Sequence, residues 1–156
     1  MLKKLSKGFT LIELLVVVSL IGILATLVLA NLNAARERGR DAQRKSDLKS
    51  IQNGLQIYYT DYGKYPDNNT SGEILGCGAT GDSVCSYGSS WTANSKTYMQ
   101  TLPEDPISTQ SYVYDRDDTD IDSYTLTACL ENASDEDGQA EAIVDCDSDW
   151  MYQIAQ

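Results

Sequence analysis

The feature that most constrains this chain is an apolar run of 22 residues, 9–30, in which Glu13 is the only charged residue. As a helix this run is about 33 Å long, which matches a bilayer hydrocarbon core of about 30 Å. An ionised side chain inside such a segment is energetically costly and is therefore a functional candidate by default. The run predicts a membrane-spanning helix, and Glu13 is its first candidate functional residue.

Two ordinary explanations compete for this run. It follows a short lysine-bearing head that ends at Gly8, and it closes on the small residue Ala30, so it has the parts of a cleavable secretory signal. As a signal, however, its apolar region would be too long and would contain a carboxylate. A plain single-pass anchor is the other explanation, and it gives Glu13 no purpose.

Glu13 gains a partner if the chain is cut after Gly8. Phe9 then becomes the N-terminus, and its α-amine lies four residues before Glu13, one turn away on the same helical face. The amine and the helix dipole both favour a carboxylate there, and the pair lowers the cost of either charge in lipid. The same pair can form between neighbouring copies, which would set the axial register of a helical bundle.

The helix is expected to continue well beyond the apolar run. No proline occurs before Pro66, and residues 31–49 are rich in good helix formers. Gly63 and Pro66 together form a stop signal, so we predict a nearly continuous helix over residues 9–62, about 80 Å long. Gly54 is expected to allow close packing. An apolar stripe with helical spacing follows one face of the second half: Leu48, Ile51, Leu55, Tyr58 and Tyr62.

Residues 63–156 are expected to form a small head of mixed structure. Residues 67–96 are dominated by Gly, Ser, Thr and Asn and predict a long loop, followed by a short helix over residues 96–102. Strand formers then gather in four segments: 112–114, 124–128, 142–144 and 150–152. A small antiparallel sheet laid on the apolar stripe would give both elements a partner, so the predicted class is α+β.

The chain has no histidine. It has four cysteines: Cys77, Cys85, Cys129 and Cys146. Without a CxxC pair, a zinc or thioredoxin-like site is not indicated, and an even count beyond a membrane segment predicts two disulfides in an oxidising compartment. Of three possible pairings we favour neighbours, Cys77 with Cys85 and Cys129 with Cys146. The second closes the longer loop and would contribute roughly 3 kcal/mol. Reduced, buried cysteines in a cytosolic domain are the alternative.

Charge is distributed unevenly along the chain. The net charge is −11, and beyond residue 50 only Lys64, Lys96 and Arg116 oppose 19 of the 23 acidic residues. Such a surface repels phosphate, so we expect no direct binding of nucleic acid. Counting Lys and Arg beside the apolar run would place the head inside the cell. The cysteines and the acidic head favour the outside, and we give them more weight.

No enzyme constellation emerges from the sequence. Histidine is absent, as are the GxSxG, P-loop and GxGxxG motifs, so we predict that the protein is not an enzyme. Two acidic runs, residues 115–122 and 135–137, offer oxygen ligands of the kind that calcium prefers. The first run lacks the glycine and the final glutamate of an EF-hand. A solvated acidic turn is the alternative for either run.

The segment Lys7-Gly8-Phe9-Thr10-Leu11-Ile12-Glu13, continued by Ile21-Gly22-Ile23-Leu24-Ala25, resembles the N-terminal signature of the type IV pilin and type II secretion pseudopilin family. The resemblance implies that a prepilin peptidase cleaves after Gly8 and that the amine of Phe9 is methylated. It implies an assembly role for Glu13. It also implies storage in the inner membrane, then extraction by an assembly ATPase and a platform protein into a helical filament of copies, in the periplasm or outside the cell.

The resemblance divides the chain into four parts: a leader (residues 1–8), a transmembrane and polymerisation helix (9–30), its amphipathic continuation (31–62) and an extracytoplasmic head (63–156). Residues 102–106 and Asp137-Gly138 are similar to the major pseudopilin of type II secretion, which binds calcium near its C-terminus. We expect no other cofactor, and calcium has its candidate ligands in Asp135 and Asp137.

Two departures from the family pattern bear on these expectations. Many members have proline where this chain has Ala30, so a bend or unwinding at that position is in doubt. The four cysteines suit a disulfide-stapled pilin head better than a typical major pseudopilin. A pilus subunit and a secretion pseudopilus subunit therefore both remain open. The alternative function is a monomeric, membrane-anchored acidic module that binds calcium or a basic partner.

Overall fold

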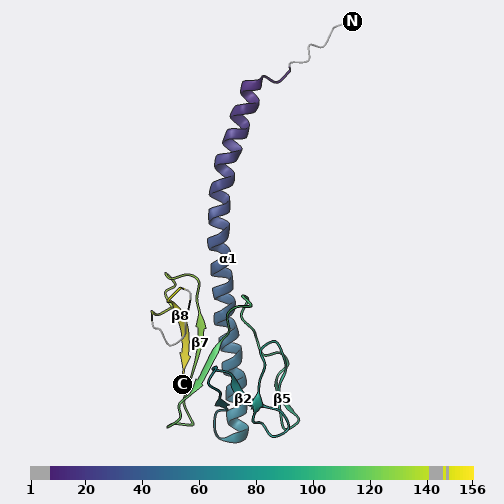
Figure 1. The fold of residues 1–156 in the computed structure, drawn as a ribbon, viewed down its shortest axis with the longest axis vertical. Helices are drawn as coiled ribbons and strands as arrows, with labels where there is room; N and C mark the ends of the chain where they lie inside the picture. Colours follow the sequence, from purple (N-terminus) through teal and green to yellow (C-terminus); the bar gives the residue numbers. More distant parts are fainter. Residues whose placement is uncertain (1–7, 141–145, 147) are drawn as a thin grey trace. The chain divides into compact units, whose positions relative to one another are not determined.

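The computed structural model describes residues 8–140, 146 and 148–156. The chain divides into two compact units, Met1–Arg36 and Glu37–Gln156. A single long helix and several short antiparallel sheets make up the described structure, as the α+β prediction requires (Figure 1).

Helix α1 (Leu11–Tyr62) has 52 residues and is continuous, as predicted. It begins two residues later than expected. It continues through residue 30 and through Gly39 without interruption. It ends where Gly63 adopts a φ of 67° and donates its N–H to the carbonyl of Tyr59 at 2.8 Å, a left-handed cap that glycine favours. With alanine in place of the family's common proline, no backbone N–H is lost at residue 30, so the helix has no reason to break there.

Among the described residues of the second unit, eight short strands form three antiparallel sheets. The first sheet has the order β1-β2-β3, the second is the hairpin β4-β5, and the third has the order β6-β7-β8. In Figure 1, β7 and β8 lie on one side of the C-terminal half of α1 and β5 lies on the other. The strand bounds are β1 Asp67–Asn68, β2 Ile74–Cys77, β3 Ser83–Val84, β4 Trp91–Ala93, β5 Lys96–Met99, β6 Val113–Arg116, β7 Tyr124–Cys129 and β8 Met151–Ala155.

The predicted loop and short helix between α1 and β6 are wrong. Residues 67–96 contain four strands, and the segment expected to be helical begins with β5 instead. Asn94 and Ser95 both have positive φ, 49° and 66°, and make the two-residue turn that joins β4 to β5. Three of the predicted strand segments do form β6, β7 and β8, whereas the fourth, residues 142–144, lies outside the described residues.

The apolar stripe of α1 is the centre of the head's core, as predicted. Leu48, Ile51 and Leu55 are fully buried and Tyr58 nearly so. Tyr62, expected to complete the stripe, is instead 37% exposed, because α1 ends at this residue. The Tyr62 ring contacts the rings of Tyr58 and Tyr98 from the outer side of the core.

Gly54 allows α1 to approach the β4–β5 hairpin closely. A Cβ at this position would lie 2.9 Å from the sulfur of Met99 and 3.1 Å from the ring of Trp91, which is fully buried. A side chain there would force these groups apart, so the predicted close packing at Gly54 is confirmed.

Two disulfides are present, and they join neighbouring cysteines. Cys77, at the end of β2, is bonded to Cys85, just after β3. Cys129, at the end of β7, is bonded to Cys146. The second bond closes the loop that leads from β7 to β8, the longest connection within the third sheet. Cys77 and Cys85 belong to the main hydrophobic core, whereas Cys129 and Cys146 form a small separate cluster with Met151. The second disulfide therefore fastens a part of the head that has little apolar core of its own.

Candidate functional site

The N-terminal end of α1 is closed by a reciprocal cap between Thr10 and Glu13. The Glu13 carboxylate accepts hydrogen bonds from the backbone N–H of Thr10 at 2.9 Å and from its hydroxyl at 2.7 Å. The Glu13 N–H in turn approaches the Thr10 hydroxyl oxygen at 3.3 Å. This is a capping box, and the Thr-x-x-Glu spacing in the sequence was its missed signal. Glu13 thus organises the helix start within its own chain, while its predicted pairing with the amine of Phe9 stays a prediction.

The described residues in the first half of α1 present an exposed apolar surface. The large apolar side chains described over residues 9–32 range in exposure from 81% for Phe9 to 41% for Leu32. By length and composition, α1 is a helix that can cross a membrane. An apolar surface of this extent is stable only in lipid or against other protein surfaces.

A fully buried arginine lies at the centre of an ion network in the head. Arg44 holds the Asp105 carboxylate with two parallel bonds, from Nε at 2.7 Å and from Nη2 at 2.9 Å. Its Nη1 donates to Asp41 and to Glu131, both at 2.8 Å. Arg44 is therefore bound to three carboxylates, two of them as deeply buried as itself.

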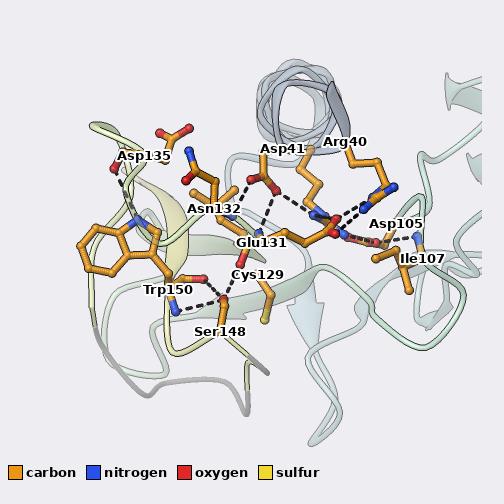
Figure 2. Close-up of polar contacts among 12 residues, drawn as sticks. Arg40, Asp41, Asp105, Ile107, Cys129, Glu131, Asn132, Asp135, Ser148 and Trp150 are labelled. Carbon is orange, nitrogen blue, oxygen red and sulfur yellow. Dashed lines mark hydrogen bonds and ion pairs between the residues drawn. The ribbon is translucent and has the colours of Figure 1, made fainter. Parts of the chain in front are cut away.

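Two further residues of α1 extend this network to the chain after β7. Arg40 binds both carboxylate oxygens of Glu131 through Nε and Nη2. Asp41 accepts the backbone N–H of Glu131 at 3.0 Å and that of Asn132 at 2.9 Å. Figure 2 shows Arg40 and Asp41 reaching from α1 to these residues, with Asp105 alongside. The network fastens the end of β7 and the 103–107 loop to one helix.

The electrostatics of the network favour the charged forms. Burial by itself would lower the pKa of Arg44, but hydrogen bonds to Asp105, Glu131 and Asp41 outweigh it and raise the pKa above its ordinary value. The hydrogen bond from Arg40 lowers the pKa of Glu131, against the effect of burial. The sequence did not indicate this centre, because residues 31–49 show only a composition that favours a helix. The only local signal was the i, i+3 pair of Asp41 and Arg44.

Asp135 and Asp137, the two predicted calcium ligands, lie close together in the structure, and both bind a lysine side chain. Lys45 Nζ binds Asp135 and lies 2.8 Å from the Asp137 carboxylate. Within residues 8–140, 146 and 148–156, no three acidic, cysteine or histidine side chains gather as a metal site. Calcium takes six to eight oxygen ligands, so with Lys45 bound to them, Asp135 and Asp137 do not supply a calcium site among the described residues.

The other acidic run forms an exposed turn between β6 and β7. Asp117 accepts hydrogen bonds from the N–H of Thr119 at 2.7 Å and from its hydroxyl at 2.6 Å. Asp122 accepts one from the hydroxyl of Tyr59 at 3.0 Å. These carboxylates shape the turn and hold it to α1, which agrees with the solvated-turn alternative.

Acid is expected to destabilise the head. The pKa values of Glu131 and Asp135 are lowered, by hydrogen bonds from Arg40 and Lys45 first, so both groups stabilise the fold fully above their unfolded pKa values, about 4.3 and 3.9. That stability is lost as the pH falls through the lower folded values. Asp47 opposes the trend, since burial raises its pKa. The pKa values of Asp61 and Asp117 are also lowered, by hydrogen bonds from Lys96 and from Thr119 first. Four lowered pKa values against one raised value predict a net loss of stability below about pH 4.

Thermal unfolding followed by near-ultraviolet circular dichroism between pH 7 and pH 3 measures this loss. All ten tyrosines and both tryptophans lie beyond residue 57, so the signal reports the head alone. Glu131→Gln should show a shallower decline with pH, because one fewer proton is taken up on unfolding. A head whose melting temperature is flat from pH 5 to pH 3 contradicts the prediction.

The sequence was compared with known protein families. Residues 3–29 match the prokaryotic N-terminal methylation motif, and residues 31–145 match the type II secretion system protein G family. The second match covers most of the chain. Between them, the two matches include nearly all of the apolar run, the capping box, the ion network and three of the four cysteines, with Cys146 just beyond the second match.

Curated relatives carry the same description, type II secretion system core protein G. The Vibrio cholerae protein is 32% identical over 130 residues, which are 81% of this chain and 85% of that protein. The Escherichia coli K12 protein is 34% identical over 100 residues, 64% of this chain and 66% of that protein, just under two thirds of its length. The Aeromonas hydrophila protein is 39% identical over 66 residues, 42% and 46% of the two chains.

No solved structure matches the chain significantly. The family match over residues 31–145 and the relative from Vibrio cholerae agree with each other and with the long helix and small disulfide-bonded head. Of the two machines that the N-terminal signature left open, they select secretion. The chain belongs to the type II secretion system protein G family of pseudopilins.

Proposed function

We propose that this protein is a structural subunit of a type II secretion pseudopilus, which polymerises through the N-terminal part of α1. The observation that carries the proposal is the surface of that helix. The large apolar side chains that the structure describes over residues 9–32 are exposed, and Glu13 is the only acidic or basic residue of that stretch. In a membrane, lipid covers this surface, and in a filament, neighbouring copies of the same helix replace the lipid.

Processing is proposed to convert the capping box into an assembly contact. A prepilin peptidase cuts after Gly8, and the amine of Phe9, then methylated, becomes a positive group next to the Thr10–Glu13 cap. Glu13 already holds the N–H of Thr10, so its carboxylate is oriented toward the chain terminus. In low dielectric, an amine from a neighbouring copy would bind this carboxylate and fix the axial register.

The four proposed parts of the chain have distinct roles. Residues 1–8 are the leader, 9–30 the membrane and polymerisation helix, 31–62 its amphipathic continuation and 63–156 the head. Disulfides and the acidic surface support a head outside the cytoplasm, with the helix stored in the inner membrane before assembly. The proposed partners are other copies of the chain, the peptidase, a platform protein and an assembly ATPase. The pseudopilin family is structural, and no catalytic role is proposed.

Intact-mass analysis of protein from the native membrane tests the proposal. The expected mass is that of a chain starting at Phe9, with one added methyl group and four fewer hydrogens from two disulfides. Cleavage after Ala30, or an uncut chain in cells with an active prepilin peptidase, is incompatible with it. A monomeric anchored module also predicts no ladder of oligomers after chemical crosslinking, whereas a filament subunit predicts one.

A further inference from the structure

The ammonium group of Lys45 is surrounded by two carboxylates and one aromatic ring. Its Nζ binds the Asp135 carboxylate, lies 2.8 Å from the Asp137 carboxylate and is 5.6 Å from the centre of the Tyr152 ring. The Lys45 side chain is only 18% exposed, although lysine side chains usually lie at the surface of a protein. Two carboxylates and an aromatic face are the usual surroundings of a bound organic cation in proteins. Here the cation is supplied by α1 of the same chain.

The acidic turn around Lys45 is closely built. Asp135 donates its N–H to the carbonyl of Asn132 at 3.1 Å, and Gly138 donates its N–H to the carbonyl of Asp135 at 3.1 Å. The Asp135 carboxylate also accepts the N–H of Asp137 at 3.0 Å. These bonds bring both carboxylates to the same side of the turn, where Lys45 meets them.

Trp150 closes the turn from the other side. Its ring N–H donates to the carbonyl of Asp135 at 3.3 Å (Figure 2). A Cβ at Gly138 would lie 1.9 Å from the same nitrogen, so only glycine leaves room for the indole. The carbonyl of Asp135 is thus already used twice, by Gly138 and by Trp150, which leaves less oxygen for any metal ion.

We propose that the ammonium of Lys45 takes the place of a divalent cation in the C-terminal segment of this protein, so that residues 132–138 fold onto α1 without calcium. A calcium ion at Asp135 and Asp137 would have to displace an ammonium that is attached to the same chain and therefore present at high effective concentration. The free energy gained by binding calcium would be offset by the cost of leaving the Lys45 ammonium without its carboxylate partners in a mostly buried position. The Cys129–Cys146 disulfide holds the same segment covalently, so two calcium-independent fastenings act together.

The charge of the site agrees with this role. The hydrogen bond from Lys45 lowers the pKa of Asp135, which keeps the carboxylate ionised over the neutral range. Hydrogen bonds to Asp135 and Asp137 raise the pKa of Lys45, against the effect of burial. One ammonium group therefore contacts two carboxylates of the turn directly.

The test uses the full chain in detergent micelles, with both disulfides formed, and follows thermal unfolding by near-ultraviolet circular dichroism. Each variant is measured in excess calcium chloride and in EGTA, with magnesium chloride at equal ionic strength as the salt control. The unmodified protein is expected to melt at the same temperature in all three. Lys45→Gln is expected to melt several degrees lower in EGTA and to regain part of that loss in calcium.

Lys49→Gln is the matched control, because Lys49 is an exposed lysine one turn further along α1 with no ion pair among the described residues. It should melt with the unmodified protein. Adding Asp135→Asn to Lys45→Gln should abolish the calcium response. A clear rise in the melting temperature of the unmodified protein in calcium overturns the proposal, and this measurement needs no variant to fold. Equal melting of the two glutamine variants, or a Lys45→Gln protein indifferent to calcium, overturns it as well.

Discussion

Replacing Arg44 with methionine is expected to lower the free energy of unfolding of the head by about 3–5 kcal/mol, the usual cost of removing one partner of a buried ion pair. The guanidinium is fully buried and holds Asp41, Asp105 and Glu131. Methionine fills a similar volume but leaves two buried carboxylates without their counter-charge. Since a small domain is stable by only about 5–15 kcal/mol, this loss is a large share of the total.

Thermal and urea unfolding, both followed by near-ultraviolet circular dichroism, measure the effect. Arg38→Met is the matched control, because Arg38 is exposed on the same helix and makes no ion pair with the described residues. It should change stability by less than about 0.5 kcal/mol. Arg44→Lys separates charge from geometry. A lysine keeps the charge but cannot make the two parallel bonds to Asp105, so it should recover only part of the loss.

If Arg44→Met is no less stable than Arg38→Met, the network is not a stabilising centre of the head. A second informative outcome is local. Loss of the network could release only the chain around Glu131 and Asn132 while the helix–sheet core survives. Hydrogen exchange of the Glu131 and Asn132 N–H groups, both bound to Asp41, distinguishes local opening from global unfolding.

Replacing Glu13 with leucine is expected to reduce filament yield by about tenfold or more, since a loss of about 1.4 kcal/mol at each subunit contact weakens it tenfold. Leucine is at least as compatible with lipid as glutamate, so membrane insertion should be preserved. Residues 37–156 form a compact unit that does not contain Glu13, so the melting temperature of this unit should not change. Processing after Gly8 should continue, and intact mass verifies this for the same sample.

Thr10→Val is the control that separates the two roles of Glu13. It removes the hydroxyl half of the capping box, which has a typical cost of about 1 kcal/mol to a helix, but leaves the carboxylate for a neighbouring amine. Filament yield, measured by shearing and immunoblotting, should therefore stay close to that of the unmodified chain. Equal losses in the two variants would mean that Glu13 acts by capping its own helix, and normal yield from Glu13→Leu would remove it from the assembly mechanism.

Much of the fold could be predicted because its signals are local. The apolar run, the helical spacing of Leu48, Ile51 and Leu55, and the stop at Gly63 depend on neighbours within a few turns, where backbone geometry alone relates them. The strands β6 and β7 could be predicted for the same reason, because their strand-forming residues are consecutive in the sequence. The hairpin β4–β5 was not, because its turn uses Asn94 and Ser95 rather than the glycine that usually marks such turns.

The sequence by itself determined the long helix, the processing motif and the position of Glu13, since each is written in consecutive residues. Only the tertiary structure decided which charges of α1 are functional and which are solvated. Arg44 and Lys45 meet carboxylates 61 to 92 residues away, whereas Arg38 and Lys49 on the same helix do not. The physical reason is desolvation. The interaction between two opposite charges becomes strong only where packing excludes water. Packing is set by the whole fold rather than by the local sequence.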